Sequence, residues 1–194
     1  MIKKLSQSLE QYNLLQHPFY LAWNEGKLSR AQLALYAGEY GSFINLISKG
    51  WQQAGETAIA KEETEHFVIW QRFASSIGSQ AIGDSLPAVK QLVSTSEANY
   101  QTYAGALGAL YAFEAQQPGT TSSKLVGLRK HYGSWKADET YFEIHANDFD
   151  EPALLLDKIN QLNETDLAAA LAACESTCKA LWDALSGIMD AQLN

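Results

Sequence analysis

Residues 29–46 read SRAQLALYAGEYGSFINL, and this stretch indicates the fold class. Its first residues pair Ser29 with Gln32, the capping-box signature of a helix N-terminus. Apolar and aromatic residues then recur at three- and four-residue spacing, the period of a helix with one buried face. They are Leu33, Tyr36, Tyr40, Phe43 and Leu46. The stretch therefore predicts a long amphipathic helix that follows Ser29.

The same helical period continues along the chain, and no segment shows the alternation of a β-strand. Further helices are predicted over residues 5–14, 56–76, 84–117, 121–132, 138–147, 152–161 and 165–191. We expect the region that opens at Asp84 to break near Ser94–Ser96 and to stop at Pro118-Gly119, and Gly133 to cap the helix before it. The pattern predicts an all-α fold, a single multi-helical bundle of roughly seven or eight helices.

The composition favours one folded domain over residues 1–194 without nucleic-acid or membrane partners. Hydrophobic residues make up 46% of the chain and charged residues 19%, enough for a large core. The net charge is −8, and the basic cluster Arg129-Lys130-His131 is too short to bind a phosphate backbone. The longest uncharged apolar stretches, residues 103–113 and 167–174, are too short to span a bilayer.

The N-terminus and the two cysteines indicate a cytoplasmic location. The first residues, MIKKLSQSLE, contain no apolar run of the kind found in a signal peptide. Cys174 and Cys178 lie four residues apart on one face of a predicted helix, whereas disulfides usually link distant elements. We therefore expect two buried thiols in a reducing compartment.

Carboxylates and a histidine with metal-ligand spacing occur in the helix over 56–76. Glu62 and Glu63 precede His66 by four and three residues, so both lie beside its ring on a helix. One of them with the imidazole would form a carboxylate–histidine pair of the ExxH type, which holds iron inside helical bundles. The alternative is a solvated acidic face on which His66 pairs with a neighbouring carboxylate.

Two further candidates lie on other predicted helices. Glu114 follows an uncharged, mostly apolar segment, where an ionised carboxylate is costly unless it binds a cation or a partner. His145 and Asp148 are three residues apart and can form a pair on a third helix. Alternatively, both regions are solvent-exposed helix ends. A mixed shell of histidine and carboxylates suits iron or manganese better than zinc.

Several segments in order carry a resemblance that covers most of the chain, from Leu14 to Glu151. They read LLQHPFYLAW (14–23), LYA (35–37), HFVIWQRFA (66–74), ALYAFEAQ (109–116), KLVGLRKHYG (124–133) and TYFEIH (140–145). This series resembles the haem-oxygenase-like superfamily, the TenA/PqqC-like proteins. Within it, the chain looks most like the p-aminobenzoate synthase branch around the chlamydial death-domain-associating protein.

The resemblance implies a non-haem iron oxidase of the di-iron type that activates O₂, with one or two iron ions or manganese. The matched ligand positions are His66, Glu114, His145 and Asp148. The branch has a first glutamate where this chain has Ile59, so that Glu62 or Glu63 would replace it from the same helix face. The branch also has a last histidine that is missing here, and Glu151 would replace it.

The resemblance also implies that the protein consumes its own tyrosine to make p-aminobenzoate. Tyr20 and Tyr36 match the relevant tyrosines of the branch, and Lys124 matches a lysine needed near the metal. The substrate is then the protein's own tyrosine or a small molecule, with O₂, and the assembly is expected to be a homodimer. The alternative is that the tyrosines only pack in the core and that Lys124 lies at the surface.

The sequence is compatible with two other functions. A TenA-like hydrolase of a pyrimidine amine would use a nucleophilic cysteine, but Cys174 and Cys178 do not align with that position. A non-catalytic helical protein with a degenerate metal site would bind a small molecule or a partner, and the altered ligand pattern after His145 fits this possibility.

Overall fold

The computed structural model describes residues 2–83 and 86–192, and within these ranges the chain forms only helices and their connections. The prediction of an all-α fold is confirmed. The helices are α1 (Ile2–Gln11), α2 (Pro18–Asn24), α3 (Arg30–Ile44), α4 (Ile47–Gln53), α5 (Thr57–Ser76), α6 (Pro87–Asn99), α7 (Tyr103–Glu114), α8 (Gln117–His131), α9 (Thr140–His145), α10 (Asp150–Asn160) and α11 (Glu164–Met189), with 3-10 turns at Leu14–Gln16 and Gly133–Trp135.

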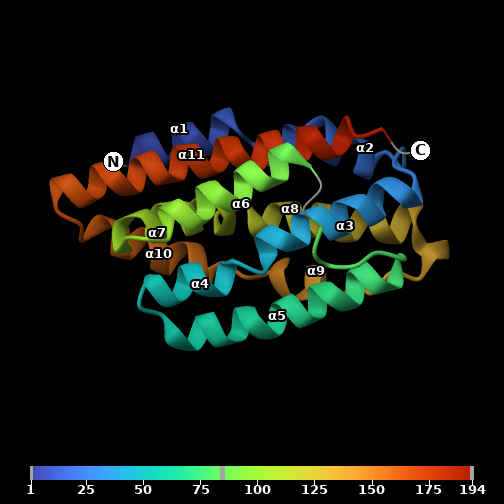
Figure 1. The fold of residues 1–194 in the computed structure, drawn as a ribbon, viewed down its shortest axis with the longest axis horizontal. Helices are drawn as coiled ribbons and strands as arrows, with labels where there is room; N and C mark the ends of the chain where they lie inside the picture. The colour runs from blue at the N-terminus through green and yellow to red at the C-terminus, as the bar shows by residue number, and fades with distance from the viewer. Residues whose placement is uncertain (1, 84–85, 193–194) are drawn as a thin grey trace.

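The helices form an elongated bundle around one apolar core. In Figure 1, α11 runs along the upper edge beside α1, α5 runs along the lower edge, and α7 lies between them. The core draws on almost every helix, and its largest fully buried side chains include Trp23, Trp51 and Trp70. Burial of such rings is the main stabilising contribution to a bundle of this kind.

The capping box that opens α3 is present as expected. The Ser29 hydroxyl accepts a hydrogen bond from the Gln32 amide at 3.2 Å, and the Gln32 side chain accepts one from the Ser29 amide at 2.8 Å. This reciprocal pair satisfies two helix-end donors. The helix ends at Ile44, however, so the prediction that Leu46 belongs to it is wrong, and Leu46 is half-buried in the turn before α4.

The described residues contain more helices, and shorter ones, than the periodicity predicted. The short helices α2 and α4 were not predicted, because a few residues cannot display a helical period. The expected break near Ser94–Ser96 is also wrong. The Ser94 and Ser96 hydroxyls bond carbonyls of their own helix, which allows α6 to continue. The break comes at 100–102, where Thr102 caps α7, and the predicted start at Asp84 lies outside the described residues.

Pro118 starts a helix instead of stopping one, so that prediction is also wrong. It lies in the first turn of α8, where its missing N–H costs no hydrogen bond. Gly133 does not cap α8 either, since Tyr132 holds the C-cap position and Gly133 opens a 3-10 turn.

A close approach between α7 and α11 fixes the helix that carries Glu114. A Cβ atom on Gly108 would overlap the backbone carbonyl of Ala170, so that only glycine permits this contact. Glu114 lies at the end of the same helix and is only 2% exposed. The sequence of α7 therefore holds a carboxylate inside the bundle.

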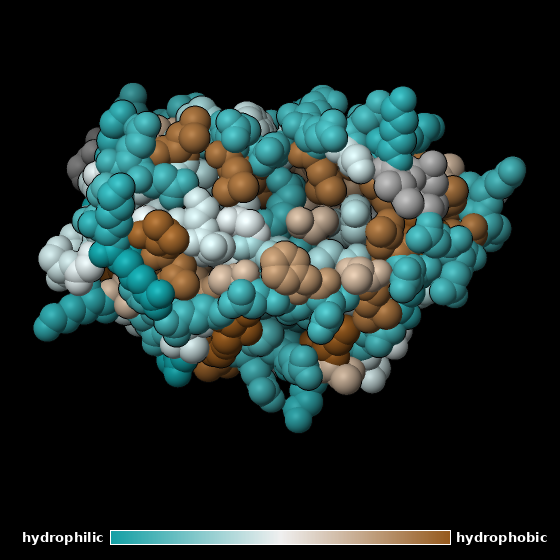
Figure 2. Space-filling model, turned by 180° about the vertical axis from the view of Figure 1, so that it is seen from behind, coloured by the Kyte–Doolittle hydropathy of each residue, from teal (hydrophilic) through white to brown (hydrophobic). Residues whose placement is uncertain are grey.

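The surface of the bundle is mostly polar with scattered apolar patches (Figure 2), and both cysteines lie inside the bundle. No helix in the described ranges is long and apolar enough to cross a membrane. Figure 2 shows, on the face opposite to Figure 1, apolar side chains in several patches between polar ones. Cys174 and Cys178 are both free and buried in α11, as predicted.

Candidate functional site

Glu63, His66 and His145 form a cluster that could hold a metal ion. Glu63 and His66 share one face of α5, and the His66 Nδ1 lies 2.7 Å from the Glu63 Oε1. His145 comes from the end of α9, and its ring meets the His66 ring edge to face, with centroids 4.6 Å apart. One ligand atom from each of the three residues lies within 4.8 Å of the others. The spacing suits a single cation bound between them.

His145 is the member of the cluster that fits a metal best. It is 1% exposed, and within the described structure neither of its ring nitrogens has a hydrogen-bond partner. Burial, with smaller effects from the charges of His66 and Lys124, lowers its pKa to about 3, so the ring is neutral at physiological pH. A buried polar group without a partner is costly, and coordination to a cation would satisfy one nitrogen.

His66 is held in a different electrostatic environment. Burial lowers its pKa, but the hydrogen bond and the charge of Glu63 outweigh this effect, and the net pKa is raised. The Glu63 carboxylate thus fixes the orientation of the imidazole and adds negative charge to the cluster.

Glu114 and Glu151 form a second, adjacent pair of carboxyl groups. Burial raises the pKa of Glu114 well above its ordinary value, and the charges of Glu151 and Glu63 raise it further. Burial and the charge of Glu63 raise the pKa of Glu151 to about 8, while its hydrogen bond with Glu114 acts in the opposite direction. The Trp51 indole donates to the Glu114 Oε1 at 3.4 Å. Near neutral pH the pair therefore retains a proton that a bound cation would displace.

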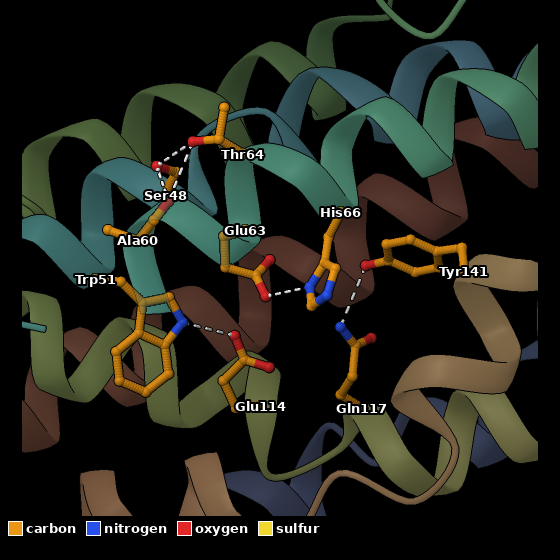
Figure 3. A network of polar contacts seen from close by, with 9 residues as sticks. All are labelled: Ser48, Trp51, Ala60, Glu63, Thr64, His66, Glu114, Gln117 and Tyr141. Atoms are coloured by element: carbon orange, nitrogen blue, oxygen red, sulfur yellow. Dashed lines mark hydrogen bonds and ion pairs between the residues drawn. The ribbon is translucent and has the colours of Figure 1, made fainter. Parts of the chain in front are cut away.

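The two groups of ligand candidates converge from different helices. Figure 3 shows Glu63 and His66 projecting from α5 toward Glu114 of α7. His145 adds a second imidazole from α9, and Glu151 adds a carboxyl group from the first turn of α10. Two histidines with carboxylates on several walls of a helical bundle are typical of iron–carboxylate centres.

The group of three does not include four of the predicted ligands, which are Glu62, Glu114, Asp148 and Glu151. Of the pair left open on α5, the structure places Glu63 against His66, whereas Glu62 is exposed to solvent. Asp148 follows α9 and is half-buried. In addition to burial, the charge of Asp148 raises the pKa of Glu114 and of Glu151, so Asp148 lies within electrostatic reach of that carboxyl pair. Helical spacing alone did not distinguish Glu62 from Glu63, because both positions share the face of His66.

Tyr20, Tyr36 and Lys124 come together inside the bundle. Lys124 is 3% exposed, and its Nζ lies 3.2 Å from the Tyr36 hydroxyl and 3.5 Å from the Tyr20 hydroxyl. Burial lowers the pKa of Lys124 to about 7, so that a large fraction of the amine is neutral at physiological pH. Burial raises the pKa of both tyrosines, which keeps the phenols protonated. The alternative that Lys124 lies at the surface is therefore wrong.

Aromatic rings connect the tyrosine cluster with the candidate ligands. The Tyr141 ring lies 4.4 Å from His145 and 4.8 Å from Trp70, centroid to centroid. Trp70 in turn meets Tyr36 at 5.7 Å. A continuous series of ring contacts thus joins Tyr36 to His145 through Trp70 and Tyr141.

The sequence patterns did not indicate Trp51 and Tyr141 as members of this site. Tyr141 precedes His145 by four residues, so its place beside the imidazole follows from helical spacing and could have been inferred. Trp51 had no such signal, because it lies on the short helix α4. Its position against Glu114 depends on tertiary packing alone.

The carboxyl pair predicts a pH dependence of stability that a double variant can reveal. A carboxyl group whose pKa is raised by folding stabilises the folded protein at low pH, and this contribution is lost as the pH rises through the folded pKa. In the metal-free protein, E114Q with E151Q should therefore gain stability over wild type as the pH rises. Each pKa unit is worth about 1.4 kcal/mol, and about 1 kcal/mol moves Tm by roughly 2–4 °C in a chain of this size.

We expect the Tm difference to grow by about 5 °C between roughly pH 5.5 and pH 8.5, measured by thermal unfolding. The comparison cancels groups that titrate equally in both proteins. A difference that does not change with pH would show that Glu114 and Glu151 hold no proton in the folded state.

Comparison with solved structures assigns the fold. A haem-oxygenase-like protein from Shewanella denitrificans has a TM-score of 0.80 at 18% identity, covering 97% of this chain and 92% of that one. A TenA homologue from Pseudomonas syringae has a TM-score of 0.79 at 14% identity, with the same coverage. The molecule is thus a haem-oxygenase-like helical protein, and it carries a buried cluster of histidines and carboxylates.

Sequence relatives assign the family. No protein-family model matches the chain. A 4-aminobenzoate synthase of Nitrosomonas europaea is 33% identical over 224 residues, covering 96% of this chain and 89% of that protein. A 4-aminobenzoate synthase of Chlamydia pneumoniae is 28% identical and covers 74% of each chain. The chain belongs to the 4-aminobenzoate synthase family, as the sequence motifs indicated.

Proposed function

We propose that this protein is an iron-dependent oxidase that makes 4-aminobenzoate from one of its own tyrosines. The observation that carries the proposal is the buried Lys124 amine within hydrogen-bond distance of the Tyr36 and Tyr20 hydroxyls. Glu63, His66 and His145 would hold a first metal ion, and Glu114 and Glu151 would extend the site to a second. When bound, iron or manganese would supply the activation of O₂.

The chemistry of the product matches the groups that meet in the core. The ring and the Cβ atom of a tyrosine supply the carbon skeleton of 4-aminobenzoate. The Lys124 nitrogen lies beside the phenol oxygens of Tyr20 and Tyr36, at the ring position where the product carries its amine. A neutral amine is also able to accept the phenol proton when a tyrosine is oxidised. These contacts support Lys124 as the nitrogen source and as the base.

The surrounding core keeps water away from this chemistry. Tyr20, Tyr36 and Lys124 are each at most 3% exposed, and Phe19 and Trp23 pack against the Tyr36 ring. Exclusion of water protects an oxidised ring from side reactions. A donor built into the chain needs no open substrate channel, which agrees with the closed packing of this cluster.

The self-consuming reaction predicts a strict limit on product. Protein loaded with iron and supplied with O₂ and a reductant should form at most about one equivalent of 4-aminobenzoate per chain and then stop, because the donor ring is used up. Mass spectrometry of tryptic peptides should show the loss of one tyrosine side chain. Tyr20 and Tyr36 fall in different tryptic peptides, since Lys27 and Arg30 lie between them.

Isotope labelling tests the nitrogen source in the same assay. Protein grown with lysine labelled at the side-chain nitrogen should give labelled product. Sustained turnover on an added small molecule, with both tyrosine peptides intact, would refute the self-consuming reaction and indicate an ordinary oxidase.

The TenA-like alternative receives less support from the structure. Both cysteines are fully buried in α11, and their side chains hydrogen-bond each other. That hydrogen bond and burial raise the pKa of Cys178, which disfavours the thiolate that a nucleophile needs.

A further inference from the structure

His145 is a ligand candidate whose ring is held by packing instead of hydrogen bonds. A ligating histidine usually donates its second ring nitrogen to a carboxylate, a carbonyl or water, and this bond fixes the orientation of the ring. Among the described residues, neither nitrogen of His145 has a hydrogen-bond partner. Coordination would satisfy one nitrogen and leave the other without a partner from the protein. The orientation of the imidazole therefore depends on the side chains that pack against it.

The rings of His66 and Tyr141 pack against this imidazole. The His66 ring meets it edge to face with centroids 4.6 Å apart, and the Tyr141 ring lies 4.4 Å away at a tilt of 50°. His66 is held in turn by Glu63, through the contact of 2.7 Å. Tyr141 lies on α9, a helix of only six residues without a side-chain cap. Because a helix this short is not stable on its own, the Tyr141 ring needs an anchor on another element.

Gln117 provides this anchor from α8. Its Nε2 donates a hydrogen bond to the Tyr141 hydroxyl at 3.2 Å, a contact drawn in Figure 3. Gln117 is 3% exposed and Tyr141 is 1% exposed, so the bond lies in a low-dielectric interior where it is strong. The backbone of Gln117 is fixed as well, since its carbonyl accepts from the Thr121 hydroxyl at 2.6 Å. The far end of the Tyr141 ring is thus tied to a second helix.

We propose that Gln117 is a positioning residue of the metal centre: its amide fixes the Tyr141 ring, and this ring fixes the imidazole of His145. The inference rests on the proposed metal centre. Neither Gln117 nor Tyr141 is a ligand in this arrangement, and the aromatic contact takes the place of the usual second hydrogen bond of a ligating histidine. Gln117 follows Glu114 by three residues, so the junction of α7 and α8 carries a carboxyl ligand candidate and the support of His145 together.

Co²⁺ binding tests this role in two single variants and their combination. Q117M removes the amide at similar volume, and Y141F removes the hydroxyl but keeps the ring. Each should lower the Co²⁺ affinity about tenfold, because the loss of an outer partner of a metal ligand costs about 10–100-fold in affinity. If Gln117 acts through Tyr141, the Q117M/Y141F protein should also lose about tenfold, instead of the roughly 100-fold expected for independent effects. Absorbance titration measures the affinity, and thermal unfolding without metal measures the stability of each variant.

The matched control removes another buried tyrosine hydroxyl. Tyr132 is 2% exposed, and its hydroxyl donates to the Trp23 carbonyl and accepts from the Leu28 amide, both at 3.2 Å. Y132F should lower the Tm of the metal-free protein, because it leaves these two buried backbone groups without that partner. Its Co²⁺ affinity should stay within about twofold of wild type. A loss of about tenfold in this control would show a general effect of core disruption and would overturn the positioning role.

The remaining outcomes separate the two proposals. If wild type binds Co²⁺ and either single variant keeps the full affinity, the positioning role is refuted while the metal centre stands. A loss of roughly 100-fold in the double variant would show that Gln117 and Tyr141 act independently, which also refutes it. If wild type binds no Co²⁺, the metal centre itself fails, and the positioning role fails with it.

Discussion

Replacing Lys124 with methionine should lower the yield of 4-aminobenzoate by about 100-fold or more while iron binding stays intact. Methionine fills nearly the same volume but has no amine, so the tyrosine hydroxyls lose both a proton acceptor and the adjacent nitrogen. The variant should fold at least as well as wild type, because a buried amine is costly to desolvate. Product per chain, iron per chain and Tm are the three measurements.

A control on the same helix distinguishes this effect from a general loss of positive charge. Lys130 is exposed on α8, and K130M should retain the full yield of product. The initial rate in wild type should also rise with pH around the Lys124 pKa of about 7, since only the neutral amine can act as a base. A normal yield from K124M would remove Lys124 from the reaction and leave it as a packing residue.

The Y20F and Y36F variants complete the same experiment without disturbing the core. Both rings are fully packed, and phenylalanine keeps their aromatic contacts. Loss of the tyrosine that serves as donor should abolish the product, and loss of the other should slow the reaction because their hydroxyls share the Lys124 amine. In a variant that still makes product, the tryptic peptide that loses a tyrosine side chain contains the donor. The tyrosine of the other peptide then has a supporting role.

Much of this site was predictable because its residues lie on long helices with a clear period. The spacing in α5 predicted that Glu62 or Glu63 lies beside His66, and the structure places Glu63 there at 2.7 Å. The uncharged segment before Glu114 indicated a buried carboxylate, and it is buried. In these cases local spacing determines which face a side chain occupies, and burial follows from the apolar neighbours.

The partner of each carboxylate was not predictable in the same way. The contact between Glu151 and Glu114 joins α10 to α7, and the Trp51 hydrogen bond comes from a helix too short to show a period. The helix boundaries failed for a related reason. Ser94 and Ser96 can either end a helix or bond back to its carbonyls, and packing decides which of the two occurs. Tertiary contacts therefore determine the inner half of the site.

The H145A variant should lose about 100-fold or more in metal affinity while the metal-free protein keeps most of its stability. Removing the ring takes away a ligand candidate from the cluster of three. It also removes two buried nitrogens that have no hydrogen-bond partners among the described residues, and this gain offsets part of the packing lost against Tyr141 and His66.

A second buried histidine provides the contrasting control for this variant. His17 is also 1% exposed, but its Nδ1 accepts from the Phe19 amide at the start of α2, and its Nε2 contacts the Ser186 hydroxyl at 3.0 Å. H17A should therefore cost about 2 kcal/mol or more through the lost helix cap and the cavity, yet leave metal binding unchanged. Iron content and thermal unfolding of both variants separate a ligand from a structural histidine. Unchanged iron content in H145A would exclude His145 from the metal centre, because the ion would then bind without this imidazole.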